Sequence, residues 1–386
     1  MEQFKVIAVI ACFTISLLLL LLFRGRVLQS PDRLQVKSLH IHPVKGIRGC
    51  TVDKAKIGPY GLEGDRTFCL QKVTRSPTSD ELKFETMYIG YYLRLALFST
   101  FLEDPGDDKT TTRNVVVTWT GDSHDESTEA SETNSKDQIR FPLQPDLQGL
   151  QQIQVELHGS PTLAYDMGEK FTEFFSRYLD CEVRLVYIGQ NSRTVLGSIA
   201  PHSKAALSKS PFVSRVLAQL PFIGRREERI VFNDIAQYLV VTQESNDQVS
   251  ARLAEGYKMD VTKFRPNVVV CGSPKPFAED YWAELTFAGG MRMSLTANCY
   301  RCQSITVDYA TGKTHEDERG QVWKKLNKDR RIDKGAKYSP VFGRYGFCRD
   351  IDHGREICVG QDVFVTKKNT TYTVFDWPGL TSFGTK

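Results

Sequence analysis

The amino-acid sequence predicts an α+β protein that is mostly β and lies behind a single N-terminal transmembrane helix. Three observations lead to this prediction. Short apolar runs recur along most of the chain with turn residues between them, which is typical of barrel-like β domains. Only two segments beyond residue 30 show the apolar spacing of a helix. The chain also opens with a long uncharged stretch, which indicates a membrane anchor.

Composition excludes several classes of protein. The 386 residues are 41% hydrophobic and 25% charged, a balance that suits one large globular domain or two of moderate size. The formal net charge is only +4 and most basic residues are interleaved with acidic ones, so we expect no nucleic-acid partner. Nine cysteines are scattered without the spacing of a disulfide framework, and we expect reduced thiols facing the cytosol.

Residues 6–23 form the predicted anchor. These eighteen residues carry no charge, which is just enough to cross a bilayer core of about 30 Å. A cleaved signal peptide is the alternative, but it would have a shorter apolar run and a small-residue cleavage site, whereas Arg24 and Arg26 follow here. The excess of basic residues after the segment predicts that the bulk of the chain faces the cytosol. We favour the mitochondrial outer membrane, with the endoplasmic reticulum as the alternative.

Residues 34–189 are expected to form a first β-rich module. The apolar patterns predict strands at residues 34–41, 51–57, 66–71, 94–100, 115–120, 153–157 and 183–188. Phe171, Phe174, Phe175, Tyr178 and Leu179 recur at helical spacing and predict a helix with one face on the core. Residues 121–138 are rich in Ser, Thr, Asp and Glu and are expected to be a disordered acidic insertion, with an acidic docking segment as the alternative.

Residues 227–367 are expected to form a second β domain, after a loop-rich, proline-containing insertion at residues 190–226 that we expect to lie over the surface. Ser245 and Gln248 are spaced as a capping box and predict the start of a helix after the first strand. The predicted strands cover residues 238–242, 263–271, 285–287, 291–295, 305–309, 356–359 and 362–365.

One close cysteine pair, Cys299 and Cys302, admits four interpretations. Half of a zinc site would require a second close pair, but Cys348 and Cys358 are separated by nine residues. A redox dithiol is expected at a helix N-terminus, whereas Cys302 leads into a predicted strand. The two remaining interpretations are a buried structural pair and a single thiolate ligand for a soft metal. The pair alone does not decide between them.

Three basic residues occupy unusual places. Lys45 lies in a loop beside a glycine, Arg66 begins a predicted strand, and Arg265 precedes a proline within an apolar strand. Each alone would ordinarily be read as a structurally paired or snorkelling charge. Together they are the set that an anionic, phosphate-bearing cofactor would require.

These residues lie in motifs that resemble a known family. The motifs are Leu39-His40-Ile41-His42-Pro43-Val44-Lys45-Gly46, Gly61-Leu62-Glu63-Gly64-Asp65-Arg66, Phe264-Arg265-Pro266-Asn267-Val268, Cys299-Tyr300-Arg301-Cys302, Thr306-Val307-Asp308 with Thr311-Gly312, and Ser339-Pro340-Val341-Phe342-Gly343-Arg344-Tyr345. In this order they resemble a MOSC N-terminal β-barrel module, placed at residues 34–189, followed by a MOSC domain at residues 227–367. Their spacing is similar to that of the mitochondrial amidoxime-reducing component.

The resemblance implies a molybdenum-pyranopterin cofactor with the Cys302 thiolate as the protein ligand to the metal. The other cofactor-binding positions that it implies are Lys45, Gly46, Arg66, Arg265, Asn267, Arg301 and Tyr345. The implied activity is the two-electron removal of oxygen from a small N-hydroxylated compound. The metal would carry this reaction, and the protein would supply a ligand, orientation and an electrostatic field. Gly46, where the family often has serine, and residues 233–237 depart from the pattern.

The resemblance also bears on partners. The sequence holds no Gly-x-Gly-x-x-Gly loop and nothing that resembles a haem, flavin or nicotinamide site, so electrons must arrive from other proteins. The family resemblance suggests cytochrome b5 and its reductase. The alternative function is a sulfur carrier or cofactor-sulfuration module with a persulfide on Cys302. The chain has no room for a desulfurase domain, so pyridoxal phosphate is not expected in it. A non-catalytic membrane protein that stores cofactor is a third alternative.

Overall fold

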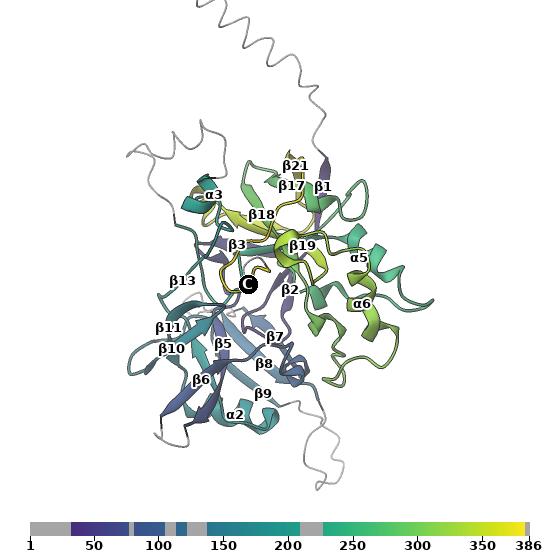
Figure 1. Ribbon diagram of the computed structural model, residues 1–386. Helices are drawn as coiled ribbons and strands as arrows, with labels where there is room; N and C mark the ends of the chain where they lie inside the picture. Colours follow the sequence, from purple (N-terminus) through teal and green to yellow (C-terminus); the bar gives the residue numbers. More distant parts are fainter. Residues whose placement is uncertain (1–31, 77–80, 105–112, 122–136, 209–226, 383–386) are drawn as a thin grey trace, which may run out of the picture. The chain divides into compact units, whose positions relative to one another are not determined.

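The computed structural model describes residues 32–76, 81–104, 113–121, 137–208 and 227–382, and Arg33–Lys386 form one compact unit. As predicted, this unit is mostly β (Figure 1). The predicted transmembrane segment at residues 6–23 lies outside the described residues. Within the described ranges, every helix is too short or too polar to cross a bilayer.

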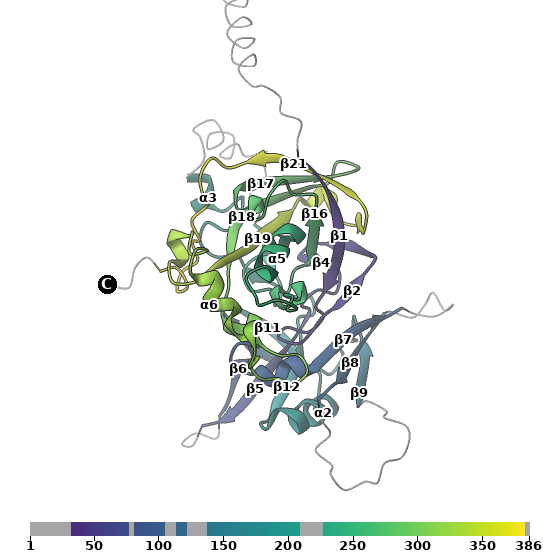
Figure 2. The same cartoon turned by 90° about the vertical axis from the view of Figure 1, so that its right-hand side faces the viewer.

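A closed β-barrel forms the first of two main β regions. Its strands are β1 (Arg33–Ile41), β15 (Tyr238–Thr242), β16 (Val268–Cys271), β17 (Trp282–Phe287), β18 (Arg292–Tyr300), β19 (Val341–Cys348) and β21 (Asp362–Lys368), with β2 (Cys50–Val52) added to β1. Their order is β16-β15-β19-β18-β17-β21-β1-β2. The barrel closes because β1 also pairs with β16 (Figure 2). The β15–β16 pair is parallel and the other pairings are antiparallel.

The closing strand β1 comes from the N-terminal end of the described chain. Leu34 and Val36 are buried, whereas the alternating residues Arg33, Gln35 and Lys37 are exposed. This alternation is the period of a strand with one face on a core. The strand pairs first with β21, then with β16, and finally with β2. The first part of the chain therefore completes a barrel whose other strands lie more than 190 residues later.

The second β region surrounds a separate apolar core. Its two sheets consist of β10 (Gln152–Leu157), β11 (Ser160–Asp166), β12 (Val183–Tyr187), β5 (Phe68–Arg75) and β6 (Leu82–Thr86), and of β7 (Phe98–Glu103), β8 (Asn114–Trp119) and β9 (Gln138–Pro142). Helix α2 (Glu169–Leu179) buries Phe174, Phe175 and Tyr178 in this core, which confirms the predicted aromatic face. The Tyr178 ring stacks on Trp119 with centroids 4.4 Å apart.

The remaining elements are short. The remaining strands are β3 (Lys54–Gly58), β4 (Gly61–Leu62), β13 (Arg193–Thr194), β14 (Arg229–Ile230) and β20 (Glu356–Cys358). The α-helices are α3 (Lys204–Ser208), α5 (Gln243–Ser250) and α6 (Val322–Asn327). The 3-10 helices are η1 (Leu93–Leu97), η2 (Val261–Phe264), η3 (Ala278–Tyr281), η4 (Gln303–Thr306), η5 (Glu318–Gln321), η6 (Lys334–Ala336) and η7 (Asp350–Asp352).

Three predicted strands were wrong in part. Residues 94–100 begin as η1, and only from Phe98 does the chain extend as β7. Residues 263–271 begin in η2 and pass through a left-handed residue at Arg265 before β16 starts. Residues 305–309 do not form a strand, because η4 turns the chain directly after Cys302. In each case an apolar run that lacks helical length folds into a tight turn of helix, which periodicity does not distinguish from a strand.

The predicted capping box was also wrong. The N-cap of α5 is Thr242, whose hydroxyl accepts a hydrogen bond from the Ser245 backbone N–H at 3.1 Å. The insertion at residues 190–226 does not lie over the surface at its start. Arg193 is fully buried there, and its guanidinium donates to the carbonyls of Val231 and Leu157 at 2.8 and 3.0 Å. Most of the predicted acidic insertion, residues 122–136, lies outside the described residues.

Candidate functional site

Cys302 lies where β18 has ended and the chain turns into η4. Its thiol is exposed, and its sulfur lies 3.0 Å from the Ser304 hydroxyl oxygen. The preceding residue is held on both sides, since the Arg301 backbone N–H donates to the Pro340 carbonyl at 2.8 Å and the Arg301 carbonyl accepts from the Trp323 indole at 2.7 Å. The thiol is therefore accessible on a backbone that is fixed.

A loop from the other β region approaches this thiol. A Cβ built on Gly90 would lie 3.7 Å from the Cys302 sulfur, which is ordinary van der Waals contact. Gly90 follows Tyr88, whose carbonyl accepts hydrogen bonds from the backbone N–H groups of Tyr91 and Tyr92 in a tight turn. The Tyr91 side chain is 82% exposed. The thiol therefore stands at a junction of the two β regions, beside a loop with tyrosines.

Arg301 and Cys299 form a buried contact beneath the thiol. The Arg301 guanidinium donates to the Cys299 sulfur at 2.8 Å and to the Phe264 carbonyl at 2.7 Å, and it lies over the Phe264 ring. Burial raises the pKa of Tyr345 well above its usual value, and the neighbouring Cys299 sulfur adds to this shift. Cys299, which the sequence motif leaves without a role, thus helps to hold the arginine that precedes Cys302.

Arg66 and Arg265 lie side by side although 199 residues separate them in the sequence. Both adopt the left-handed backbone conformation, with φ of 53°, which costs a residue other than glycine about 1–3 kcal/mol. The Arg66 guanidinium donates to the Arg265 carbonyl at 3.1 Å and to the Asn267 side-chain oxygen at 3.3 Å. Asn267 also accepts from the Leu239 backbone N–H at 3.1 Å, which fixes this amide against the barrel.

Arg66 has a carboxylate counter-charge, whereas Arg265 binds a backbone carbonyl. Arg66 also donates to Asp65, a carboxylate whose side chain is fully buried. Burial alone would raise the pKa of Asp65, but Arg66 and His42 outweigh it and hold this pKa far below its usual range. Arg265 donates to the Ile47 carbonyl at 2.6 Å, and its second terminal nitrogen, Nη2, is buried without a partner among the described residues. Burial and the charge of Arg66 lower the pKa of Arg265 to about 10.

Lys45 points to a different partner. Its ammonium is buried, is paired with the Asp234 carboxylate, and lies 5.2 Å from the centre of the Tyr88 ring. Burial lowers the pKa of Lys45, while Asp234 opposes this shift. The His158 imidazole nitrogen Nε2 lies 3.3 Å from the same Asp234 oxygen. Gly46, which follows Lys45, has a φ of +89°, so this turn requires a residue without a side chain.

The structure therefore brings the predicted site residues into one neighbourhood at the junction of the two β regions. Arg66, Arg265 and Asn267 contact one another, and Arg301 and Tyr345 meet at Cys299 beneath the thiol. Sequence reasoning missed the participants that follow: Tyr88, Gly90, His158, Asp234 and Tyr300. The one available signal was the departure of residues 233–237 from the family pattern, which was noted without a role for Asp234.

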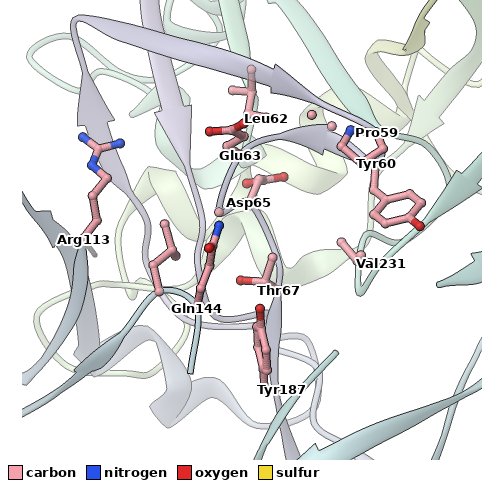
Figure 3. Close-up of a pocket in the computed structure, with 14 residues that line it drawn as sticks. Pro59, Tyr60, Leu62, Glu63, Asp65, Thr67, Arg113, Gln144, Tyr187 and Val231 are labelled. Atoms are coloured by element: carbon pink, nitrogen blue, oxygen red, sulfur yellow. The ribbon is translucent and has the colours of Figure 1, made fainter. Parts of the chain in front are cut away.

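A pocket of about 400 Å³ lies next to this site but is distinct from the thiol (Figure 3). It is lined by the turn at residues 58–65 together with Thr67, Arg113, Gln144 and Tyr187, among others. Asp65, which holds Arg66, is part of this lining, whereas Cys302 and Arg265 are not. The pocket therefore lies against the loop that carries Arg66.

Two segments of this chain match models of known protein domains. Residues 227–364 match the MOSC domain, and residues 33–79 match the MOSC N-terminal beta barrel domain. Both MOSC models therefore match this chain, and the N-terminal match, at residues 33–79, includes the strand β1 that closes the barrel. The resemblance inferred from the motifs is confirmed at this level.

The individual relatives are of two kinds. Molybdenum cofactor sulfurase from Solanum lycopersicum is 24% identical over 72% of this chain and 29% of its own length. Mitochondrial amidoxime-reducing component 1 is 27% identical in Mus musculus, over 50% of both chains, and 26% identical in Homo sapiens, over 54% of this chain and 55% of the relative. The chain thus matches about half or less of each relative's length. The YUAD protein from Bacillus subtilis aligns at 7% identity with a TM-score of 0.32 over 86% of this chain and 94% of that chain, too weak a likeness to bear on fold or function.

The residues present fit an anionic cofactor that holds a soft metal. Arg265 offers a buried guanidinium nitrogen without a partner in the described part of the chain, and Arg66 lies beside it. Guanidinium groups bind phosphate through charge-assisted hydrogen bonds. The exposed Cys302 thiol can serve as a soft ligand. Among the described residues, no cluster of three His, Cys, Asp or Glu side chains could hold a metal ion.

Proposed function

We propose that this chain is a molybdenum-cofactor-dependent oxidoreductase that reduces N-hydroxylated compounds, with Cys302 as the thiolate ligand to molybdenum. One observation carries this proposal: the exposed Cys302 follows Arg301, whose guanidinium binds the carbonyl of Phe264 directly before Arg265. Arg265 in turn contacts Arg66, and both of these arginines have strained backbone conformations. Strained backbone of this kind persists only where surrounding contacts fix it, and it is common at active sites and ligand-binding sites. The relatives include amidoxime-reducing components, which supply the reaction class.

Each side chain has a definite role in this proposal. Arg66, Arg265 and Lys45 would hold the pterin and its phosphate, with Asn267 and Asp65 fixing the orientation of Arg66. Arg301, bonded to Cys299 and to the Phe264 carbonyl, would fix the backbone that presents Cys302. When bound, the cofactor would supply the two-electron removal of oxygen from nitrogen. The protein would supply ligand, orientation and electrostatics.

Electron supply and location belong to the same proposal. We propose that electrons arrive from cytochrome b5 and its reductase, and that residues 6–23 attach the chain to a membrane with the remainder facing the cytosol. The mitochondrial outer membrane is favoured and the endoplasmic reticulum is the alternative. Fractionation of cells that express the full-length chain tests the location, because deletion of residues 2–24 should move the protein from the membrane pellet to the supernatant.

Activity of the purified full-length chain tests the central proposal. Molybdenum-loaded protein with reduced viologen as electron donor should convert benzamidoxime to benzamidine, and Cys302→Ala should abolish this conversion. The matched control is Cys358→Ala, which removes a partly buried cysteine on β20 and should keep the wild-type rate. Loaded wild-type protein that leaves benzamidoxime unchanged would contradict the proposal.

A cofactor-sulfuration module is the second candidate. Its support is that molybdenum cofactor sulfurases from Solanum lycopersicum and Bos taurus match 72% and 76% of this chain, more than the amidoxime-reducing components do. In that case the accessible Cys302 thiol would carry a persulfide. The test is incubation with a cysteine desulfurase and cysteine, followed by mass spectrometry. A 32 Da increase confined to Cys302, together with no reduction of benzamidoxime, favours this candidate over the reductase.

A further inference from the structure

His158 has the same unusual backbone conformation as the two site arginines. Five described residues other than glycine have positive φ, with values of 52–60°, and His158 is one of them together with Arg66 and Arg265. His158 lies in the two-residue turn between β10 and β11, beside Gly159. Asn, Asp and His are the residues other than glycine that adopt this conformation most readily, so the turn accepts a histidine and presents its imidazole at a fixed position.

The C-terminal segment fixes this turn. The indole N–H of Trp377 donates to the His158 carbonyl at 2.7 Å, and Trp377 is fully buried although it lies beyond the matched MOSC domain. Two residues earlier, the Phe375 ring meets the Tyr300 ring edge-on, with centroids 4.9 Å apart. One segment therefore holds both His158 and the residue that lies two positions before Cys302.

The imidazole is paired with the Asp234 carboxylate, which also binds the Lys45 ammonium. His158 Nε2 lies 3.3 Å from Asp234 Oδ1, and the imidazole ring lies 5.2 Å from the Tyr88 ring. The Asp234 and His158 side chains are 48% and 21% exposed, so small molecules can reach the pair. Gly90, two residues after Tyr88, would place a Cβ 3.7 Å from the Cys302 sulfur, so the loop that carries Tyr88 links the imidazole to the thiol.

The proposed reaction consumes two protons. Removal of oxygen follows R₂N–OH + 2e⁻ + 2H⁺ → R₂NH + H₂O, in which the N–O bond breaks, nitrogen gains one proton and the departing hydroxyl gains the other. The two electrons would come from an external donor protein, and the bound cofactor would supply their transfer to the substrate. Histidine paired with a carboxylate is a common general acid near neutral pH. If Nε2–H donates to Asp234, the protonated ring has its Nδ1 proton left to give.

We propose that His158, held by Asp234 and Trp377, donates a proton to the substrate nitrogen as its N–O bond breaks, while the second proton comes from solvent. This inference rests on the proposed reductase function and adds to it a proton donor from the N-terminal β region. Asp234 and Trp377 are positioning residues in this scheme, because they act through the imidazole.

A matched pair of variants tests the proposal in full-length, molybdenum-loaded protein. His158→Gln should lower kcat for benzamidoxime by about 10²–10⁴-fold per bound molybdenum, with KM changed by only a few-fold. His202→Gln should leave kcat unchanged, because His202 forms a similar imidazole–carboxylate pair, but with Glu228 in place of Asp234. Trp377→Phe, which removes the indole donor together with part of a buried ring, should produce an intermediate loss in kcat.

A second readout does not depend on turnover. With ¹³C-labelled histidine, the resonance that His158→Gln removes should shift when the product-type ligand benzamidine is added to loaded wild-type protein, and the His202 resonance should not. A kcat for His158→Gln within about two-fold of wild type, or a His158 resonance that ignores benzamidine, overturns the proton-donor role alone. Loaded wild-type protein that does not reduce benzamidoxime overturns the proposed function and this role together.

Discussion

Substitution of Asp65 by asparagine should be the most informative perturbation of the site's architecture. The Asp65 carboxylate is fully buried and bonds to Arg66 and to the His42 backbone N–H, the latter at 2.8 Å. Asp65→Asn would leave the nearly buried Arg66 guanidinium without its counter-charge. Breaking one partner of a buried pair typically costs about 3–5 kcal/mol. An exposed pair offers the comparison: Asp104 and Arg113 are 72% and 38% exposed, and Asp104→Asn should cost less than about 1 kcal/mol.

Urea unfolding of the full-length chain measures both changes, and acid titration adds a second test. Because Arg66 and His42 depress the pKa of Asp65 in the folded protein, its stabilising contribution is present above the unfolded pKa of about 3.9 and is lost as the pH falls below it. The difference between wild type and Asp65→Asn should therefore be largest near neutral pH and shrink in acid. An Asp65→Asn cost no greater than that of Asp104→Asn would refute this account of the Arg66 anchor.

Three further substitutions have defined outcomes. Burial raises the pKa of Glu279 to about 7. The stabilising contribution of the protonated Glu279 side chain is therefore fully present below about pH 4.5 and is lost as the pH rises through 7. In urea unfolding, Glu279→Gln should remove up to about 3 kcal/mol of this pH dependence. Gly61 has a φ of +132° and its Cβ would lie 2.8 Å from the Gln237 carbonyl oxygen, so Gly61→Ala should lower the free energy of unfolding by about 2–4 kcal/mol. Gly90→Val should slow alkylation of Cys302 by iodoacetamide several-fold, as followed by peptide mass spectrometry, because a bulkier side chain would crowd the sulfur. Unchanged alkylation would show that this loop does not flank the thiol.

Much of the fold could be predicted because the hydrophobic patterns of several barrel strands indicate their secondary structure. The alternation in β1 and the apolar runs of β15, β17 and β21 are typical of strands, and the spacing of the aromatic residues in α2 is typical of a helix. The sequence did not predict that β1 closes a barrel whose main strands lie more than 190 residues away. Closure depends on long-range pairing of β1 with β16 and β21, which no local pattern encodes.

The site was predictable only in part, for a physical reason. Arg265 precedes a proline, where local sterics favour extended backbone, yet tertiary contacts hold it in the left-handed region. His158 and Asp234 lie 76 residues apart and meet only through the packing of the turn between β10 and β11. Their pairing has no sequence signature, whereas the motifs around Cys302 and Arg265 do.

The ligand to the metal is the central claim, and the molybdenum content of purified protein tests it most directly. Wild type, Cys302→Ala and Cys299→Ala should be prepared as full-length chains and assayed for molybdenum, pterin and zinc. We predict that molybdenum is retained in wild type and in Cys299→Ala and is lost in Cys302→Ala. Zinc in place of molybdenum, with both cysteines required to hold it, would contradict the account.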